Sequence, residues 1–438
     1  MVMHVEIISK DIIKPSSPTP HHLRNFKLSF LDQIAPSLYI PIIFFYHSNH
    51  GVGSVDPFER SRSLKKSLAE TLTRFYPLAG APINEDFSIN CNDKGADYIE
   101  ARVPCNLSQV VDIPKAQELI QLLPFEPYHS CTEIGKEVLL AVQYNIFECG
   151  GVAIAVCVSH KIADGTSAVT FVNAWAGTSR GASEVISPSF DAAIHFPLRD
   201  TTGFMPNEAI SKENIVTKRF VFNKSSIAAL RKEASVAFGP EDRGPSRVEA
   251  ISAFIWRRFM AMAKAKQGNK KPKLFAAVHA VNLRERMVPQ LPVHSFGNLW
   301  RFAIATSPVE IEKDCSFSGE DKLRKSIMEI NSEYVKKLQD SDGHLDFMKK
   351  TSKQLVQGEI EFCNFSSWCW FPYYEVDFGM GKPTWVCSPS IPCKNVVVIM
   401  STKDGDGIET WINMKGEDMA IFEHDTELLS FASSANGE

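Results

Sequence analysis

Residues 152–167 read VAIAVCVSHKIADGTS, and the assignment of the fold begins from this stretch. Its first seven residues are apolar, which predicts a buried strand that delivers His160 to its end. A turn containing Asp164 and Gly165 follows, and then an apolar helix begins. The stretch therefore places an imidazole at the edge of a sheet, where a cleft can form.

His160 has the chemistry of a general base. Forming an ester from an alcohol and a thioester requires a group that removes the hydroxyl proton, and neutral histidine, with a pKa near 6.5, suits that role. Asp164 can fix the loop through hydrogen bonds or a buried ion pair, although the spacing alone does not show that it touches the imidazole. The chain has twelve histidines and a single HxxxD. Taken without the other motifs of the chain, His160 could equally be a structural residue at the end of a strand.

Composition narrows the class of protein. The net charge of -4 does not suggest a nucleic-acid binder. The start of the chain lacks the apolar core of a signal peptide, and the apolar stretch 38–46 is far shorter than the roughly 20 residues that cross a bilayer. Ten cysteines contain no CxxC pair, which gives no support for a zinc site. We expect a cytoplasmic protein with reduced thiols, no membrane contact and no metal.

The order of apolar patterns predicts two halves of similar size. Residues 191–213 lie in an irregular stretch rich in Pro, Asp, Thr and Asn, which indicates a linker between residues 1–190 and 214–438. The predicted elements, apart from the strand at 152–160, are a helix at 61–76, a strand at 216–222, helices from Lys224 and near Ser246, a strand at 275–281, and a hairpin closed by KDGD at 403–406.

Eight short motifs occur in an order that resembles one family. They are PSSPTP (15–20), LSFLDQ (28–33), FYPLAG (75–80), HKIADG (160–165), SRVEAISAFIW (246–256), NLRER (282–286), FGN (296–298) and DFGMG (377–381). Together they resemble the plant BAHD acyltransferases, with the family's HxxxDG at His160, Asp164 and Gly165. The details are most similar to the subgroup of alkaloid O-acetyltransferases. Met380 replaces the tryptophan of the family's DFGWG, and Ala81 stands where many relatives have arginine.

The resemblance implies an α/β fold of two chloramphenicol-acetyltransferase-like domains, each a mixed β-sheet flanked by helices, with a solvent channel between them. Acyl-CoA, with acetyl-CoA favoured, would enter from one face as a co-substrate. A small-molecule alcohol would enter from the other, and the two would meet at His160. The resemblance also implies a monomer with no permanently bound cofactor.

The resemblance assigns further residues to the site. Asp377 is expected to form a buried ion pair with Arg284 and Arg286, a role of structural support rather than catalysis. Ser366 and Trp368 are candidates to stabilise the oxyanion, with a packed aromatic segment, which also contains Trp370, as the alternative. The candidates for contacts with CoA are Ser246, Arg247 and Asn298.

The predicted function is transfer of an acyl group, most simply acetyl, to a hydroxyl of a specialised metabolite, with an alkaloid favoured as the acceptor. Alternatives are a longer or aromatic acyl donor, a terpenoid or phenolic acceptor, a carrier-linked condensation domain and a non-catalytic binding protein. A serine hydrolase would need a GxSxG motif. Cys157 is three residues from His160 on the predicted strand and would face the other way, so we expect direct transfer through a ternary complex without an acyl-enzyme.

Overall fold

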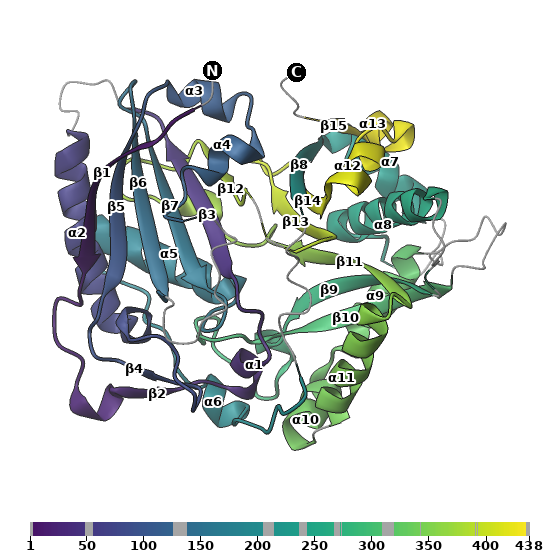
Figure 1. The fold of residues 1–438 in the computed structure, drawn as a ribbon, viewed down its shortest axis with the longest axis horizontal. Helices are drawn as coiled ribbons and strands as arrows, with labels where there is room; N and C mark the ends of the chain where they lie inside the picture. Colours follow the sequence, from purple (N-terminus) through teal and green to yellow (C-terminus); the bar gives the residue numbers. More distant parts are fainter. Residues whose placement is uncertain are drawn as a thin grey trace.

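Two β-sheets, one built mainly from each half of the chain, form the framework of the protein (Figure 1). A computed structural model describes residues 3–48, 56–125, 138–204, 214–235, 243–266, 272, 274–308, 319–341, 343–389, 391 and 393–434. Mixed sheets flanked by helices confirm the predicted α/β class. Part of the predicted linker, 205–213, lies outside the described residues.

The N-terminal sheet has six strands and a helical layer on one face. Its order is β1 (Glu6–Ile13), β5 (Ala96–Val103), β6 (Leu140–Phe147), β7 (Val152–Ser159), β3 (Tyr39–Tyr46) and β12 (Trp385–Cys387). The layer consists of α2 (Pro57–Arg74) and α5 (Gly165–Ser179), which contact each other. Shorter elements of this half are β2 (Asn25–Lys27), β4 (Ser88–Asn90), α1 (Phe30–Gln33), α3 (Leu107–Val111), α4 (Ala116–Ile120) and α6 (Ala192–His195).

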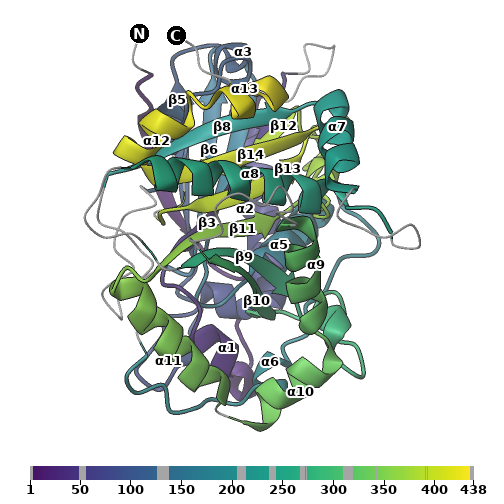
Figure 2. The ribbon, with the colours of Figure 1, turned by 90° about the vertical axis from the view of Figure 1, so that its right-hand side faces the viewer.

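The C-terminal sheet has seven strands, and α8 (Arg247–Ala265) crosses the face that is turned toward the viewer in Figure 2. Its order is β10 (Trp300–Pro308), β9 (Leu274–Asn282), β11 (Ile360–Ser367), β13 (Val396–Ser401), β14 (Ile408–Lys415), β8 (Ile215–Phe222) and β15 (Ala432–Ser434). The other helices of this half are α7 (Lys224–Ser235), α9 (Gly319–Glu329), α10 (Ser332–Asp340), α11 (Gly343–Val356), α12 (Gly416–Phe422) and α13 (Thr426–Phe431).

Strand β12 belongs to the C-terminal half in sequence but pairs with β3 of the N-terminal sheet, as its position in Figure 1 shows. Trp385 of β12 stacks on Phe45, with ring centroids 5.2 Å apart. Its indole N–H also donates to Glu409 of β14 at 3.3 Å, and Glu409 pairs with Arg219 at 2.8 Å. The two halves are therefore interlocked, a feature that a division of the chain at 191–213 does not anticipate.

Local sequence explains where the main elements begin. The predicted helix at 61–76 starts earlier, at Pro57, because proline is favoured in the first helical turn. Ser246 starts α8 through a capping box with Glu249, and the KDGD segment joins β13 to β14 as predicted. The buried strand expected at the start of the HxxxD motif is β7, whose eight residues are all buried.

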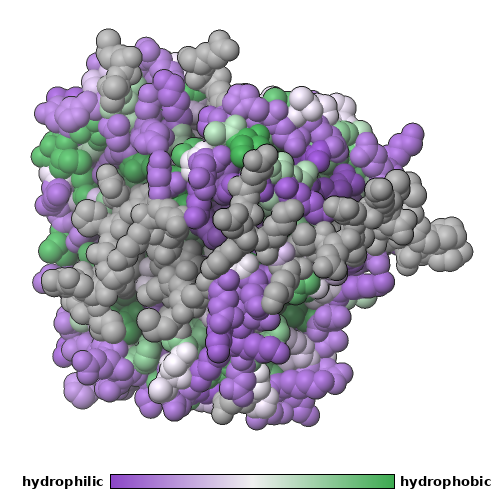
Figure 3. Space-filling view, turned by 45° about the vertical axis from the view of Figure 1, so that its right-hand side comes forward, coloured by the Kyte–Doolittle hydropathy of each residue, from purple (hydrophilic) through white to green (hydrophobic). Residues whose placement is uncertain are grey.

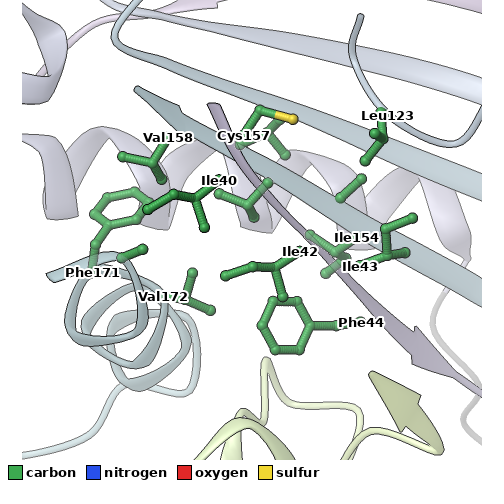
Figure 4. Close-up of a cluster of buried hydrophobic side chains, with 14 of the residues drawn as sticks. Ile40, Ile42, Ile43, Phe44, Leu123, Ile154, Cys157, Val158, Phe171 and Val172 are labelled. Atoms are coloured by element: carbon green, nitrogen blue, oxygen red, sulfur yellow. The ribbon is translucent and has the colours of Figure 1, made fainter. Parts of the chain in front are cut away.

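The core beside the motif joins α5 to the sheet. Figure 4 shows Phe171 and Val172 of α5 directed toward β3 and β7, among apolar side chains such as Ile42 and Val158. Cys157 is 1% exposed and belongs to this core. The described part of the surface seen in Figure 3 is mostly hydrophilic. No helix among the described residues is both long enough and apolar enough to cross a membrane.

Candidate active site

His160 is the first residue after β7 and lies at the junction of the two halves. Its backbone N–H donates to the carbonyl of Leu38 at 2.8 Å, which continues the pairing of β7 with β3. Its Nδ1 lies 2.9 Å from Oδ1 of Asn298, a residue of the C-terminal half. The ring of Trp300 lies beside the imidazole, with centroids 5.9 Å apart. The imidazole is therefore held by residues more than 130 positions away in the sequence.

Asn298 fixes which nitrogen of His160 carries the proton. Its Nδ2 donates to Oδ1 of Asp32 at 2.8 Å and to the carbonyl of His160 at 2.7 Å. Its Oδ1 accepts from the indole N–H of Trp300 at 3.1 Å. Because an indole nitrogen can only donate, these contacts define the orientation of the amide. Oδ1 must then accept from Nδ1–H of His160, which leaves Nε2 with a free lone pair.

Asp32 orients Asn298 in turn, and it is buried. Its Oδ1 also accepts from the backbone N–H of Asn298 at 2.9 Å, while its Oδ2 accepts from the backbone N–H and the hydroxyl of Ser29 at 2.8 and 2.6 Å. Burial raises the pKa of Asp32, and its hydrogen bonds to Ser29 and Asn298 lower it. These roles of Asp32 and Asn298 were not predicted. The capping box of α1 at Ser29 and Asp32 was the available sequence signal.

Asn298 was expected to contact CoA, and the structure corrects that prediction. Both polar atoms of its side chain are used by Asp32, His160 and Trp300, as described above. The residue is fully buried. Asn298 therefore supports the histidine and does not offer a polar group to a ligand.

Asp164 supports the loop that follows His160 through hydrogen bonds and also through a buried ion pair, the two interactions that the sequence analysis offered as alternatives. Its Oδ1 accepts from the backbone N–H of Ser167 at 2.8 Å and so caps α5. Its carboxylate also forms a bidentate pair with Arg284, at 2.8 and 3.1 Å, and Oδ2 accepts from the backbone N–H of Leu299 at 3.1 Å. The side chains of Asp164 and Arg284 are 6% and 1% exposed, so the ion pair is buried.

The predicted ion pair between Asp377 and the two arginines is wrong. Arg284 is committed to the buried pair just described. Arg286 donates to the backbone carbonyls of Ile327 and Ile330, at 3.3 and 2.8 Å. The sequence alone does not show which carboxylate pairs with an arginine that lies far away along the chain. The prediction chose Asp377 as the partner of Arg284, whereas the structure pairs Arg284 with Asp164.

Asp377 closes its own turn instead. Its Oδ1 accepts from the backbone N–H groups of Gly379, Met380 and Gly381, at 2.7, 3.0 and 2.8 Å. Both glycines have positive φ angles, 90° and 83°, which this tight turn requires. Its Oδ2 lies 3.7 Å from Arg180, in a partly exposed pair. Met380 is buried in the N-terminal core, where it takes the place of the family's tryptophan.

Ser366 and Trp368, the oxyanion candidates, lie together at the end of β11. The indole N–H of Trp368 donates to Oγ of Ser366 at 2.9 Å, so the hydroxyl hydrogen of Ser366 remains available to a ligand. Gly165 makes room for this segment, because a methyl group there would lie 2.9 Å from a ring carbon of Phe371 and 3.8 Å from Nε1 of Trp368. The glycine of the HxxxDG motif thus permits close packing of α5 against the aromatic segment.

A cavity of about 1890 Å³ lies between the two halves, where the solvent channel was expected, and it is called the channel below. Its lining includes His160 from the N-terminal half, and Ser366 and Trp368 from the C-terminal half. Ser246 and Arg247, the remaining candidates for contacts with CoA, also line it. Asp377 and Cys157 are not among the described lining residues. No cluster of three metal-ligating side chains occurs in the part of the chain that the structure describes.

Burial lowers the pKa of His160, and the nearby Asp164 carboxylate and the hydrogen bond to Asn298 oppose that shift only in part. The imidazole is therefore neutral at pH 7. A neutral ring with Nδ1–H bound to Asn298 presents a basic Nε2. Nε2 of His160 can therefore accept a proton from a hydroxyl group bound in the channel.

Comparisons with known proteins give a consistent result. A model described as the Transferase family matches residues 3–429. Stemmadenine O-acetyltransferase of Catharanthus roseus is 41% identical, with 97% of each chain covered. Vinorine synthase of Rauvolfia serpentina is 41% identical, with 99% of each chain covered, and its crystal structure has a TM-score of 0.83 at 40% identity over 98% of this chain and 99% of that chain. Limonoid 21-O-acetyltransferase of Melia azedarach is 36% identical over 98% of this chain and 99% of that protein.

The two acidic motif residues should differ in their effect on stability. Asp164→Ala leaves Arg284 buried and unpaired, which typically costs about 3–5 kcal/mol. Asp377→Ala removes contacts to backbone N–H groups and an exposed ion pair that contributes about 0–1 kcal/mol. Thermal unfolding of both variants should show the larger loss for Asp164→Ala. If that variant is insoluble, Asp164→Asn, which can still cap α5, provides the comparison. An equal or larger loss for Asp377→Ala would contradict this assignment.

Proposed function

The chain belongs to the Transferase family, the BAHD acyltransferases, and we propose on that premise that His160 is the general base in acyl transfer from acyl-CoA to a hydroxyl of a specialised metabolite. The resemblance to the subgroup that contains vinorine synthase is confirmed, and the protein is an acyltransferase. The observation that carries the proposal is the bond from Nδ1 of His160 to Asn298, because it leaves Nε2 as the basic nitrogen.

In the proposed reaction, both substrates occupy the channel together. Nε2 of His160 takes the proton of the acceptor hydroxyl while the oxygen attacks the thioester carbonyl carbon. The tetrahedral intermediate then breaks its carbon–sulfur bond, and the proton passes from His160 to the departing sulfur. The products are the ester and free CoA, and His160 returns to its neutral form.

Ser366 is the proposed donor to the oxyanion. Charge develops on the thioester oxygen during attack, and a fixed donor in the channel stabilises it. The bond from Trp368 to Oγ of Ser366 orients the hydroxyl so that its hydrogen is free to donate. Trp368 therefore acts on the oxyanion through Ser366, and the serine takes the direct role.

Basic side chains support CoA binding at one end of the channel. Arg231, Arg243 and Arg247 line it together with Ser246, and Arg231 donates to the carbonyl of Pro245 at 2.8 Å. The cluster thus joins α7 to the start of α8. Guanidinium groups suit the phosphates of CoA. Ser246 is itself held at the cap of α8, because its oxygen accepts from the backbone N–H of Glu249 and its hydroxyl also bonds to the Glu249 carboxylate.

The acyl group and the acceptor are inferred from the relatives. Stemmadenine O-acetyltransferase and limonoid 21-O-acetyltransferase are named for acetyl transfer, so acetyl-CoA is the favoured donor. Among the acceptors, we favour an alkaloid over a limonoid-like terpenoid, because stemmadenine O-acetyltransferase and vinorine synthase are each 41% identical and the limonoid enzyme is 36% identical. Large apolar side chains such as Trp300, Phe302 and Phe347 line the channel and suit a polycyclic acceptor.

The remaining features support a single chain that transfers the acyl group directly. Cys157 is buried in the core and is not among the described residues that line the cavity, which supports a ternary complex without an acyl-enzyme. The protein is also proposed to act as a monomer. The eight described cysteines are free thiols, which is consistent with a cytoplasmic location.

Acceptor-dependent release of CoA tests the function and the base together. Purified protein, acetyl-CoA and a panel of alkaloid and limonoid alcohols should release free thiol only when an acceptor is present. His160→Ala should remain folded and lose about 10²–10⁴ in rate. The wild-type rate should rise with pH and level off below the ordinary histidine pKa of about 6.5, because burial favours the neutral imidazole.

Two outcomes would contradict the proposal. Thiol release that does not require an acceptor would indicate a hydrolase, and a folded His160→Ala variant with near-normal turnover would remove the general base. Asn173→Ala is the matched control, because within the described residues that side chain donates to its own helix, at the carbonyl of Val169, and is not among the residues lining the cavity.

Ser366→Ala should lower kcat by about 10²–10³, since removal of one oxyanion donor typically has that effect. Ser366→Thr retains the hydroxyl and should keep most of the activity. Ser388→Ala is the control, because Ser388 is buried and is not among the described residues that line the cavity. Kinetics with saturating acetyl-CoA would separate kcat from KM. Equal rates for Ser366→Ala and wild type would show that the oxyanion donor lies elsewhere.

A further inference from the structure

Trp370 differs from the other aromatic residues of its segment. Its side chain is 90% exposed, whereas Trp368 is 6% exposed and Phe371 packs against the N-terminal core. The alternative that Trp370 belongs to a packed aromatic segment is therefore wrong. An indole exposed to this extent offers the face of its ring to a planar ligand.

Trp370 also lines the channel that contains His160. It follows Cys369, whose thiol has a pKa that burial raises and that the charge of Arg247 lowers in part. The carbonyl of Cys369 accepts from Ser401, and Arg247 donates to the carbonyl of Gly405 in the turn that follows β13. These contacts place Trp370 at the same end of the channel as the arginine cluster, near its boundary with solvent.

We propose that the exposed indole of Trp370 is the stacking surface for the adenine ring of acyl-CoA. This inference rests on the proposed function, because it assumes that the arginine cluster takes the phosphates. Adenine is planar, and both of its faces can stack on an indole. The phosphates lie between adenine and the pantetheine arm, so arginines next to an aromatic surface match the order of groups in CoA. The arm then extends inward toward Trp368 and His160.

The alternative ligand for Trp370 is the acceptor, and charge distinguishes the two. The arginines of the cluster favour an anionic ligand at this end. A neutral or cationic alcohol gains nothing from them, whereas CoA carries several negative charges. Trp370 therefore belongs to the donor side of the channel.

Isothermal titration with CoA and with 4′-phosphopantetheine, which lacks the adenosine, tests the inference. Base–aromatic stacking corresponds to about 5- to 150-fold in affinity. Trp370→Ala should raise the Kd for CoA by about tenfold. The Kd for 4′-phosphopantetheine should stay within about twofold of the wild-type value. The same variant should also bind adenosine 3′,5′-bisphosphate, which carries the adenine without the pantetheine arm, about tenfold more weakly than wild type does. Trp370→Phe should retain part of the affinity.

Phe58→Ala is the matched control, because Phe58 is a 39% exposed aromatic residue on α2 that is not among the described residues lining the channel. The inference is overturned if Trp370→Ala binds CoA like wild type, or if it weakens CoA and 4′-phosphopantetheine equally. A wild-type protein that does not bind CoA would instead refute the proposed function, so the two failures are distinguishable.

Discussion

The buried pair between Asp164 and Arg284 is the contact on which the site depends. It joins the turn after β7 to the segment that precedes β10, and so connects the two halves below the imidazole. Arg284 also donates to the carbonyls of Ser295 and Gly297, and Asp164 accepts from Leu299. Burying two charges is costly, and a buried pair is weak support for stability. Its effect here is to fix the segment that contains Asn298 against the strand that ends at His160.

That placement decides the chemistry of the histidine. With Asn298 held by Asp32 and Trp300, its amide oxygen faces Nδ1 of His160 and leaves Nε2 as the base. Burial keeps the ring neutral. The aspartate of the HxxxD motif thus acts at a distance, through backbone placement, and the histidine is oriented by an amide. The glycine after Asp164 serves packing, since it allows the aromatic segment at 368–371 to approach α5.

Sequence reasoning located the elements that have strong local signals. The apolar run of β7, the start of α8 near Ser246 and the hairpin of β13 and β14 were all predicted. It failed where the answer depends on long-range pairing. The prediction paired Arg284 with Asp377, whereas in the structure Arg284 pairs with Asp164. A three-residue strand such as β12 has no sequence pattern that shows with which sheet it pairs. Asn298 was assigned to the ligand because a motif does not show which way a buried amide faces.

The tautomer of His160 is the most direct test of this account. Nitrogen NMR of protein labelled with ¹⁵N-histidine, with His160 assigned by its loss in His160→Ala, reports protonation at each ring nitrogen. We predict that at pH 7 Nδ1 carries the proton and Nε2 does not, and that Asn298→Ala weakens this preference. A spectrum in which Nε2 is protonated, as the opposite tautomer or as imidazolium, would contradict the assignment of Nε2 as the general base.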